Sequence, residues 1–361
     1  MKNVIDVLKV VFYSLFFLFV FAACEENEPA PNPEPVESES GVFILNQGRW
    51  GENNASLSYY DFKTGITSPD ITDGTLGDLA EDMIAYGSKL YVVVNGSSRI
   101  TIFDLNTRLR VKDIDLFNGD QPRNPNGLTS YNGKVYVTTN DGNVVRIDTV
   151  SLSQDGITPV GPNPVGIAAV KNKLYVANSG GYLPEYNNTL SIVDIPTFKE
   201  EKVLTVGLNP NIVRADGSGN VYLTYRGNYV DDFGGFQKID INHTVTNIPI
   251  SANQDFEIVF SDFGDAWIFY YGVTYNPDYT TNNTVGIYSL YGRDVLTTDQ
   301  FITDGTKINT PYGIGVNHET GDVYIADTDY SSPSTVYIFD LHGKKKQTLS
   351  VGFMACKFVF K

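Results

Sequence analysis

The chain has 361 residues, of which 42% are apolar and 13% aromatic, so it is long enough to bury a large core. Its formal net charge of −16 repels phosphate backbones and anionic lipid surfaces, and nucleic acid is therefore not expected as a partner. Val, Ile, Tyr, Phe and Thr dominate the patterned segments, where no apolar pattern of helical period persists, so we predict an all-β chain.

A signal peptide is predicted for residues 1–23, where lysines precede an apolar run that is short for a membrane-spanning helix. The letters FAAC, which end at Cys24, resemble a lipobox, so we expect lipidation at Cys24 and a lipid anchor in the outer membrane. A plain cleaved signal is the alternative. The acidic Pro/Glu linker at 24–40 resembles the export tag of surface lipoproteins of gut anaerobes, although a solvated linker has the same composition. We expect exposure at the cell surface.

A repeated segment occupies the rest of the chain, and its clearest copies span 122–150, 163–197 and 310–344. Each copy has a short apolar stretch, a Gly or Asn turn, an alternating strand, a loop and a second alternating strand ending in Asp. One anchor residue per copy gives spacings of 48, 45, 39, 47, 46 and 56 residues, and short strands at periods of about 40–50 residues indicate a β-propeller. Residues 41–361 are thus predicted to form seven four-stranded antiparallel blades, anchored at Phe43, Tyr91, Tyr136, Tyr175, Tyr222, Ile268 and Tyr324.

The third copy predicts how a blade is built. From the axis outward we expect strand A at 127–131, strand B at 134–139, strand C at 143–148 and strand D near 156–160. An Asn-Gly turn joins A to B, which is a strong hairpin signal. An aspartate recurs where strand C ends, and recurrence at one blade position indicates a turn former, not a catalytic acid. These aspartates are Asp61, Asp104, Asp148, Asp194, Asp240 and Asp340.

The two ends of the propeller segment predict how the ring closes. The first strand, at 42–46, has no A strand before it, and the chain finishes with an A-like strand at 357–361. Pairing the two in one blade removes the open sheet edges and closes the ring.

The candidate ligand site lies on the face from which B–C and D–A loops emerge. Long B–C loops are expected at 46–56, 178–189, 225–236, 270–284 and 327–335, and long loops on a rigid scaffold usually carry function. Their aromatic and amide side chains form a surface that stacks on flat ligands and hydrogen-bonds their rims, or they pack the loops on one another. The predicted ligand-binding residues are Arg49, Trp50, Asn95, Asn140, Asn178, Tyr182, Tyr186, Arg226, Tyr229, Tyr271, Tyr275, Asp327 and Tyr330.

Signals for catalysis or for a metal are weak. The three histidines fall in turns away from that face and form no metal-ligating pattern. The pairs Asp231-Asp232 and Asp327/Asp329 could ligate Ca²⁺, but their spacing is not that of an EF-hand. Cys356 is predicted to be buried as a small apolar residue. We therefore expect no enzymatic activity, no catalytic residue, no cofactor and no metal site.

The repeat resembles a known family. KLYVANSGG at 173–181, followed by NTLSIVD at 188–194, is similar to the YVTN-type repeat of YncE-like seven-bladed propellers. With GVFILNQGRWGENNASLSYYD at 41–61 and the closing CKFVFK, the layout resembles the surface propeller lipoproteins of gut anaerobes that include the cobalamin-binding BtuG. The resemblance implies capture of a corrinoid, as transported ligand, and delivery to a BtuB-like TonB-dependent transporter.

A corrinoid carries amides and a phosphodiester. Tyr and Trp could cover its apolar edges, Asn and Asp could bond the amides, and Arg49 or Arg226 could meet the phosphate. A glycan-binding or adhesion module uses the same residue types and is the main alternative, and a periplasmic scaffold is a third.

Overall fold

The computed structural model describes residues 40–181, 185–232, 234–250, 255–260, 266–275, 281–290 and 298–361. The signal peptide, Cys24 and residues 24–39 of the linker lie outside these ranges, so the lipid anchor remains a prediction. Within the described ranges the regular structure is β-strand throughout, and no helix there could cross a membrane.

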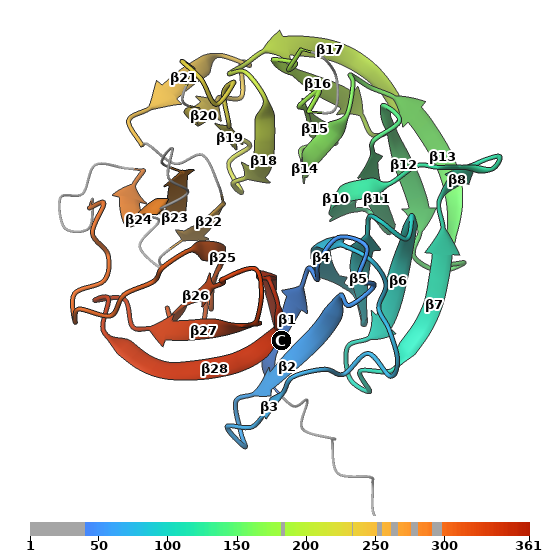
Figure 1. The fold of residues 1–361 in the computed structure, drawn as a ribbon. Helices are drawn as coiled ribbons and strands as arrows, with labels where there is room; N and C mark the ends of the chain where they lie inside the picture. Colours follow the sequence, from blue (N-terminus) through green and yellow to red (C-terminus); the bar gives the residue numbers. More distant parts are fainter. Residues whose placement is uncertain are drawn as a thin grey trace, which may run out of the picture. The chain divides into compact units, whose positions relative to one another are not determined.

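Seven sheets stand around an axis (Figure 1). In six of them the strand that comes first in the chain is innermost, and in the seventh the innermost strand is the last strand of the chain. Blade 1 consists of β29 (Ala355–Phe360), β1 (Gly41–Asn46), β2 (Ser56–Asp61) and β3 (Thr67–Ser68). Blade 2 consists of β4 (Ala80–Tyr86), β5 (Lys89–Val94), β6 (Arg99–Asp104) and β7 (Arg110–Asp115), and a small hairpin of β8 (Phe117–Asn118) and β9 (Gln121–Pro122) follows. Blade 3 consists of β10 (Pro125–Tyr131), β11 (Lys134–Thr139), β12 (Asn143–Asp148) and β13 (Ser153–Pro159).

The remaining blades continue in chain order. Blade 4 consists of β14 (Pro164–Val170), β15 (Lys173–Asn178), β16 (Thr189–Asp194) and β17 (Lys199–Thr205). Blade 5 consists of β18 (Pro210–Ala215), β19 (Val221–Tyr225), β20 (Gly235–Ile239) and β21 (Val245–Ile248). Blade 6 consists of β22 (Phe256–Phe260), β23 (Ala266–Tyr275) and β24 (Thr281–Ser289), with bridges from Thr298 and Gln300 on its outer side. Blade 7 consists of β25 (Pro311–Val316), β26 (Val323–Asp327), β27 (Pro333–Phe339) and β28 (Lys345–Phe353).

The predicted seven-bladed propeller is confirmed. The seven anchors all lie in second strands and are buried. In blade 3, strands B and C have the predicted bounds, while strand A begins two residues earlier than predicted.

The core lies between neighbouring blades. Leu90 and Val92 of β5 pack in a cluster with Phe43 of blade 1. Tyr91 packs on the opposite face of the same strand, in a cluster with Val135 of blade 3. Because both faces of each inner sheet are covered, second strands such as KLYVVV are nearly continuous runs of apolar residues.

The termini close the ring as predicted. β1 pairs antiparallel with β29, with Val42 opposite Phe360, and the C-terminus lies beside blade 1 in Figure 1. Gly41 and Lys361 exchange backbone hydrogen bonds of 3.1 and 2.8 Å. No edge of the inner ring is therefore left unpaired at the junction.

The aspartates at the ends of strand C form turns. Asp148 accepts hydrogen bonds from the backbone N–H groups of Ser151 and Val150, at 2.7 and 3.0 Å. Asp240 is bonded in the same way by Thr244 N–H at 2.7 Å, which lowers the pKa of its carboxyl. The predicted structural role of these acids is confirmed.

Candidate functional site

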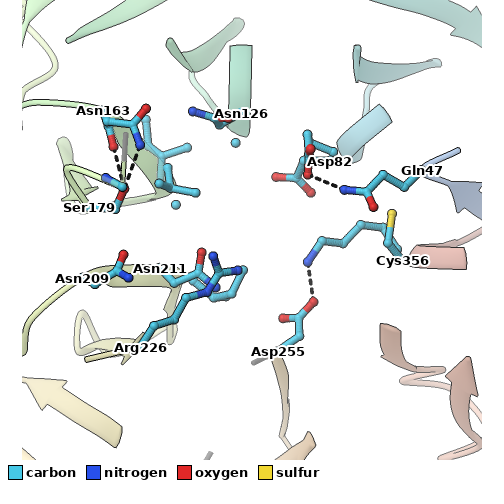
Figure 2. Close-up of a pocket in the computed structure, with 18 of the residues that line it drawn as sticks. Gln47, Asp82, Asn126, Asn163, Ser179, Asn209, Asn211, Arg226, Asp255 and Cys356 are labelled. Atoms are coloured by element: carbon cyan, nitrogen blue, oxygen red, sulfur yellow. Dashed lines mark hydrogen bonds and ion pairs between the residues drawn. The ribbon is translucent and has the colours of Figure 1, made fainter. Parts of the chain in front are cut away.

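A cavity of about 420 Å³ lies at the axis, at the end of the ring where the innermost strands begin. Residues from inner strands and from B–C loops line it (Figure 2). It therefore opens on the face predicted to carry the ligand site.

β-Bulges aim side chains into this cavity. Among the described residues, the innermost strands of six blades have a register shift in their first residues, and β22 of blade 6 has none. A bulge leaves residues unpaired and redirects their side chains, and bulges are frequent beside binding sites. The cavity-lining residues at the six bulges include Glu81, Asn126, Val165, Asn211, Tyr312 and Cys356.

The local sequence explains where three of these bulges occur. Asn124, Asn163 and Asn209 have φ of 48°, 46° and 58°, in the left-handed region that asparagine tolerates better than most residues. Each precedes the proline that opens a strand, where a missing N–H costs no ladder bond. At Gly166 a Cβ would lie 2.1 Å from the Asn211 carbonyl oxygen, so only glycine allows β14 and β18 to approach this closely.

Asn126 joins three blades. Its Oδ1 accepts from Asn95 Nδ2 at 3.0 Å, and its Nδ2 donates to the Pro164 carbonyl at 2.8 Å and to Asn140 Oδ1. Asn95 and Asn140, which we predicted to bind ligand, are thus bonded to a cavity-lining amide and are not lining residues themselves.

A second chain of hydrogen bonds follows the cavity wall through four consecutive blades. Tyr271 Oη donates to the Tyr312 carbonyl at 2.6 Å, and Tyr312 Oη donates to Gln47 Oε1. Gln47 Nε2 donates in turn to Glu81 Oε2 at 3.0 Å. Burial raises the pKa of Glu81, although Gln47 and Arg226 act in the opposite direction. A buried carboxyl with a raised pKa holds its proton more strongly than an exposed one does, which makes it a candidate proton donor.

An ion network forms the deep end of the cavity. Asp255 pairs with Lys357, and Arg214 Nη2 approaches Asp255 at 3.6 Å and its Nε approaches Glu257 at 3.8 Å. Burial alone would raise the pKa of Asp255, but Lys357 and Arg214 outweigh it and lower that pKa. Burial also raises the pKa of Asp82, which accepts from Leu128 N–H at 3.1 Å.

Four predicted ligand residues line the cavity: Tyr186, Arg226, Tyr229 and Tyr271. Tyr186 and Tyr229 pack edge to face, with ring centroids 6.0 Å apart. The expectation that Tyr271 lies in a loop is wrong, because residues 270–275 extend β23 in a long hairpin with β24; Tyr271 is buried there.

Three further predicted residues lie in or beside B–C loops of the same end without lining the cavity. Trp50 is 76% exposed. The Arg49 guanidinium pairs with Glu52 of its own loop and lies over the Phe353 ring. Tyr330 packs edge to face on Tyr312, with ring centroids 5.7 Å apart.

Two predicted residues are buried in structural roles. Asn178 Nδ2 donates to Thr189 Oγ1 and Ser191 Oγ within blade 4, at 3.0 and 2.9 Å. The Asp327 carboxylate accepts from the backbone N–H groups of Asn309 and Thr310. Tyr182 and the side chain of Tyr275 lie outside the described residues.

The residues at the bulges and in the ion network were not predicted from the sequence. A signal was present, because Asn126, Val165 and Asn211 each follow an Asn-Pro pair and Tyr312 follows Thr-Pro, at the start of a copy of the repeat. The acids and bases that line the cavity carry no comparable signal; they are Glu81, Asp82, Arg214, Asp255 and Lys357.

No family model matches the chain, and no curated protein matches it. Solved propellers match over most of its length. A Bacteroides fragilis protein described as a candidate 6-phosphogluconolactonase is 13% identical, with a TM-score of 0.61 over 91% of this chain and 100% of that one. The periplasmic gluconolactonase PpgL of Pseudomonas aeruginosa is 10% identical, with a TM-score of 0.61 over 89% and 99%. Dihydro-heme d1 dehydrogenase NirN is 11% identical, with a TM-score of 0.56 over 90% and 76%.

These likenesses show the fold, and membership of the YncE-like family stays a prediction. They also correct one expectation. We expected no enzymatic activity, but propellers with this architecture include a gluconolactonase and a dehydrogenase, so that exclusion is wrong. Weak catalytic motifs in the sequence did not justify it.

Proposed function

We propose that this chain captures a large, amide-bordered ligand of corrinoid type over the mouth of the axial cavity and delivers it to a TonB-dependent outer-membrane transporter. The observation that carries the proposal is the placement of exposed aromatic rings and inward-facing amides at one end of the ring. Trp50 and Tyr229 are 76% and 57% exposed there, and Asn126 and Asn211 line the cavity below. Rings would cover apolar edges while the amides bond the polar rim.

The size of the cavity favours binding across the mouth. Its volume of about 420 Å³ is within the range of small-molecule pockets, and a whole corrinoid is larger. The macrocycle would therefore rest on the loops, with one polar arm entering the cavity. The resemblance to the cobalamin-binding lipoproteins supports the same choice of ligand, and it supports surface exposure and the transporter as partner.

Calorimetric titration of the full chain in detergent with cyanocobalamin tests the proposal. We expect saturable binding, weakened roughly tenfold or more by Trp50→Ala or Tyr229→Ala, because central aromatic side chains dominate many interfaces. Val150→Ala is the matched control, since Val150 is exposed in a turn at the opposite end of blade 3. Absence of binding to cyanocobalamin, with binding to a member of a glycan panel, would replace this proposal by the glycan-binding alternative. Protease treatment of intact cells tests surface exposure.

A second candidate function is acid–base catalysis on a small polar substrate such as a sugar lactone. One observation favours it: the Glu81 carboxyl, whose pKa is raised by burial, faces a cavity that Arg226 also lines. Acid release from gluconolactone, measured in a pH-stat, tests this function, and Glu81→Gln should abolish any activity found. Activity retained by that variant would exclude Glu81 as the catalytic acid.

A further inference from the structure

Two arginines at the loop-rich end have different surroundings. Arg49 Nη2 lies 3.9 Å from Glu52, and its guanidinium lies over the Phe353 ring, 5.1 Å from the centroid. Arg226, by contrast, lines the axial cavity and makes no ion pair with any residue that the structure describes. An unpaired, partly buried cation beside a cavity is expected to attract an anion.

Arg226 is held in place before any ligand arrives. Its backbone N–H donates to the Asn209 carbonyl at 2.9 Å. In the amide orientation that satisfies both groups, Asn211 Oδ1 accepts from Arg226 Nη2 at 3.0 Å and from Nε at 3.2 Å. Figure 2 shows the two side chains together, across the cavity from Gln47. Asn211 is itself buried, so the guanidinium is fixed from one side.

This arrangement leaves part of the guanidinium fork for a ligand. Asn211 uses two of the five N–H groups that an arginine carries, and no further side-chain bond of Arg226 is found among the described residues. The remaining groups include Nη1, which can pair with Nη2 to hold two oxygens of a phosphate or carboxylate.

The acids near Arg226 do not neutralise it. Glu81 is bonded to Gln47, and burial favours its neutral form. Asp255 is paired with Lys357. Asp232, in the loop after Arg226, accepts through its backbone carbonyl from Asn228 N–H, and its carboxylate makes no ion pair with Arg226.

We propose that Arg226, positioned by Asn211, forms an oxyanion subsite that binds a phosphate or carboxylate group of the ligand. The inference rests on the proposed function in that it names the part of the ligand that enters the cavity. A corrinoid phosphodiester and the carboxylate of a sugar acid share this chemistry.

Binding of inorganic phosphate and of gluconate to the full chain in detergent tests the subsite, measured by calorimetry or by quenching of tyrosine fluorescence. We expect Arg226→Gln to weaken phosphate binding tenfold or more, Arg226→Lys to retain part of it as a point charge, and Arg49→Gln to leave it unchanged. Asn211→Ala should weaken it less than Arg226→Gln. Thermal melting of each variant verifies folding.

Phosphate binding that is equal in the wild type and in a folded Arg226→Gln variant would overturn the subsite, as would loss of binding in Arg49→Gln. Comparing cyanocobalamin with cobinamide, which lacks the phosphodiester, separates the sources of the anion. A larger effect of Arg226→Gln on cyanocobalamin than on cobinamide supports the phosphodiester. If phosphate binds at Arg226 and no corrinoid binds, the subsite stands and the proposed function fails. If cyanocobalamin binds and Arg226→Gln does not weaken that binding, the proposed function stands and the subsite at Arg226 fails as part of it.

Discussion

Lys357, in the last strand of the chain, forms an ion pair with Asp255, which precedes the innermost strand of blade 6. The two residues belong to blades that are not neighbours, and β25 of blade 7 contacts the innermost strands of both. Both side chains are largely buried, and Arg214 is the only other cation within 4 Å of Asp255 among the described residues. The pair therefore joins two blades that have one other blade between them.

We expect Lys357→Met to destabilise the protein by about 3–5 kcal/mol, because it leaves the buried Asp255 carboxylate with only the longer contact to Arg214, at 3.6 Å. Chemical denaturation measures the change. Lys346→Met is the matched control: its ion pair with Asp322 has a length of 2.7 Å, but the Lys346 side chain is half-exposed. Removing an exposed pair should cost less than about 1 kcal/mol. Equal effects of the two substitutions would mean that burial does not distinguish these pairs.

Truncation after Phe353 tests the closure of the ring. It removes β29, which supplies the innermost strand of blade 1 and, through Cys356 and Lys357, part of the cavity lining. We expect a broad or much lower melting transition by circular dichroism, because β1 loses its partner and the ring gains open edges. Deleting Lys361 alone removes its two backbone hydrogen bonds with Gly41 but leaves β29 in place, so it should have a much smaller effect. An unchanged transition after the longer truncation would show that closure is dispensable.

The fold could be predicted because its signals are local and repeated. A buried second strand such as KLYVVV, and an acid such as Asp148 at the end of strand C, have the same meaning in every blade. Each copy supports the reading of the others, so the blade number follows from the spacing alone.

The site was only partly predictable, because a β-bulge is a property of two paired strands. Asn126 and Glu81 lie in the cavity because the register shifts beside them. An Asn-Pro pair precedes the shift at Asn126, but no comparable pair precedes Glu81. Composition also misled: the stretch around Tyr271 reads as a loop because it is rich in Tyr, Asn and Thr, yet it forms a long hairpin. Asn178 looked like a ligand group, although its amide satisfies neighbouring hydroxyls.

Cys356 is expected to resist thiol reagents in the native protein. Its side chain is 7% exposed, its Sγ donates to the Leu45 carbonyl at 3.5 Å, and burial raises the pKa of the thiol. Because the thiolate is the reactive form, labelling should be slow until the protein unfolds. The denatured protein isolated from membranes should then expose one thiol if Cys24 is lipidated and two if it is not, since the chain has two cysteines. Rapid labelling of the native protein at Cys356 would contradict the burial.

Glu81 should make the stability of the protein depend on pH. Burial raises its pKa above the usual value, so between the unfolded and folded values the native state binds a proton that the unfolded chain has lost. The stability is present below the unfolded pKa and falls as the pH rises through the folded pKa. Glu81→Gln is neutral at every pH and still offers an oxygen to Gln47, so it should gain stability relative to the wild type as the pH rises from about 4 to 8.

Thermal melting of both proteins across this range measures the difference. The pKa of the neighbouring Asp82 is also raised by burial, but that residue is common to both proteins, so its contribution largely cancels. Glu200→Gln, on the exposed outer strand β17, is the control and should not alter the pH dependence. A difference between Glu81→Gln and the wild type that is constant with pH would mean that Glu81 is ionised in the cavity. The carboxyl would then repel an anion at Arg226, and the cavity would favour cationic ligands.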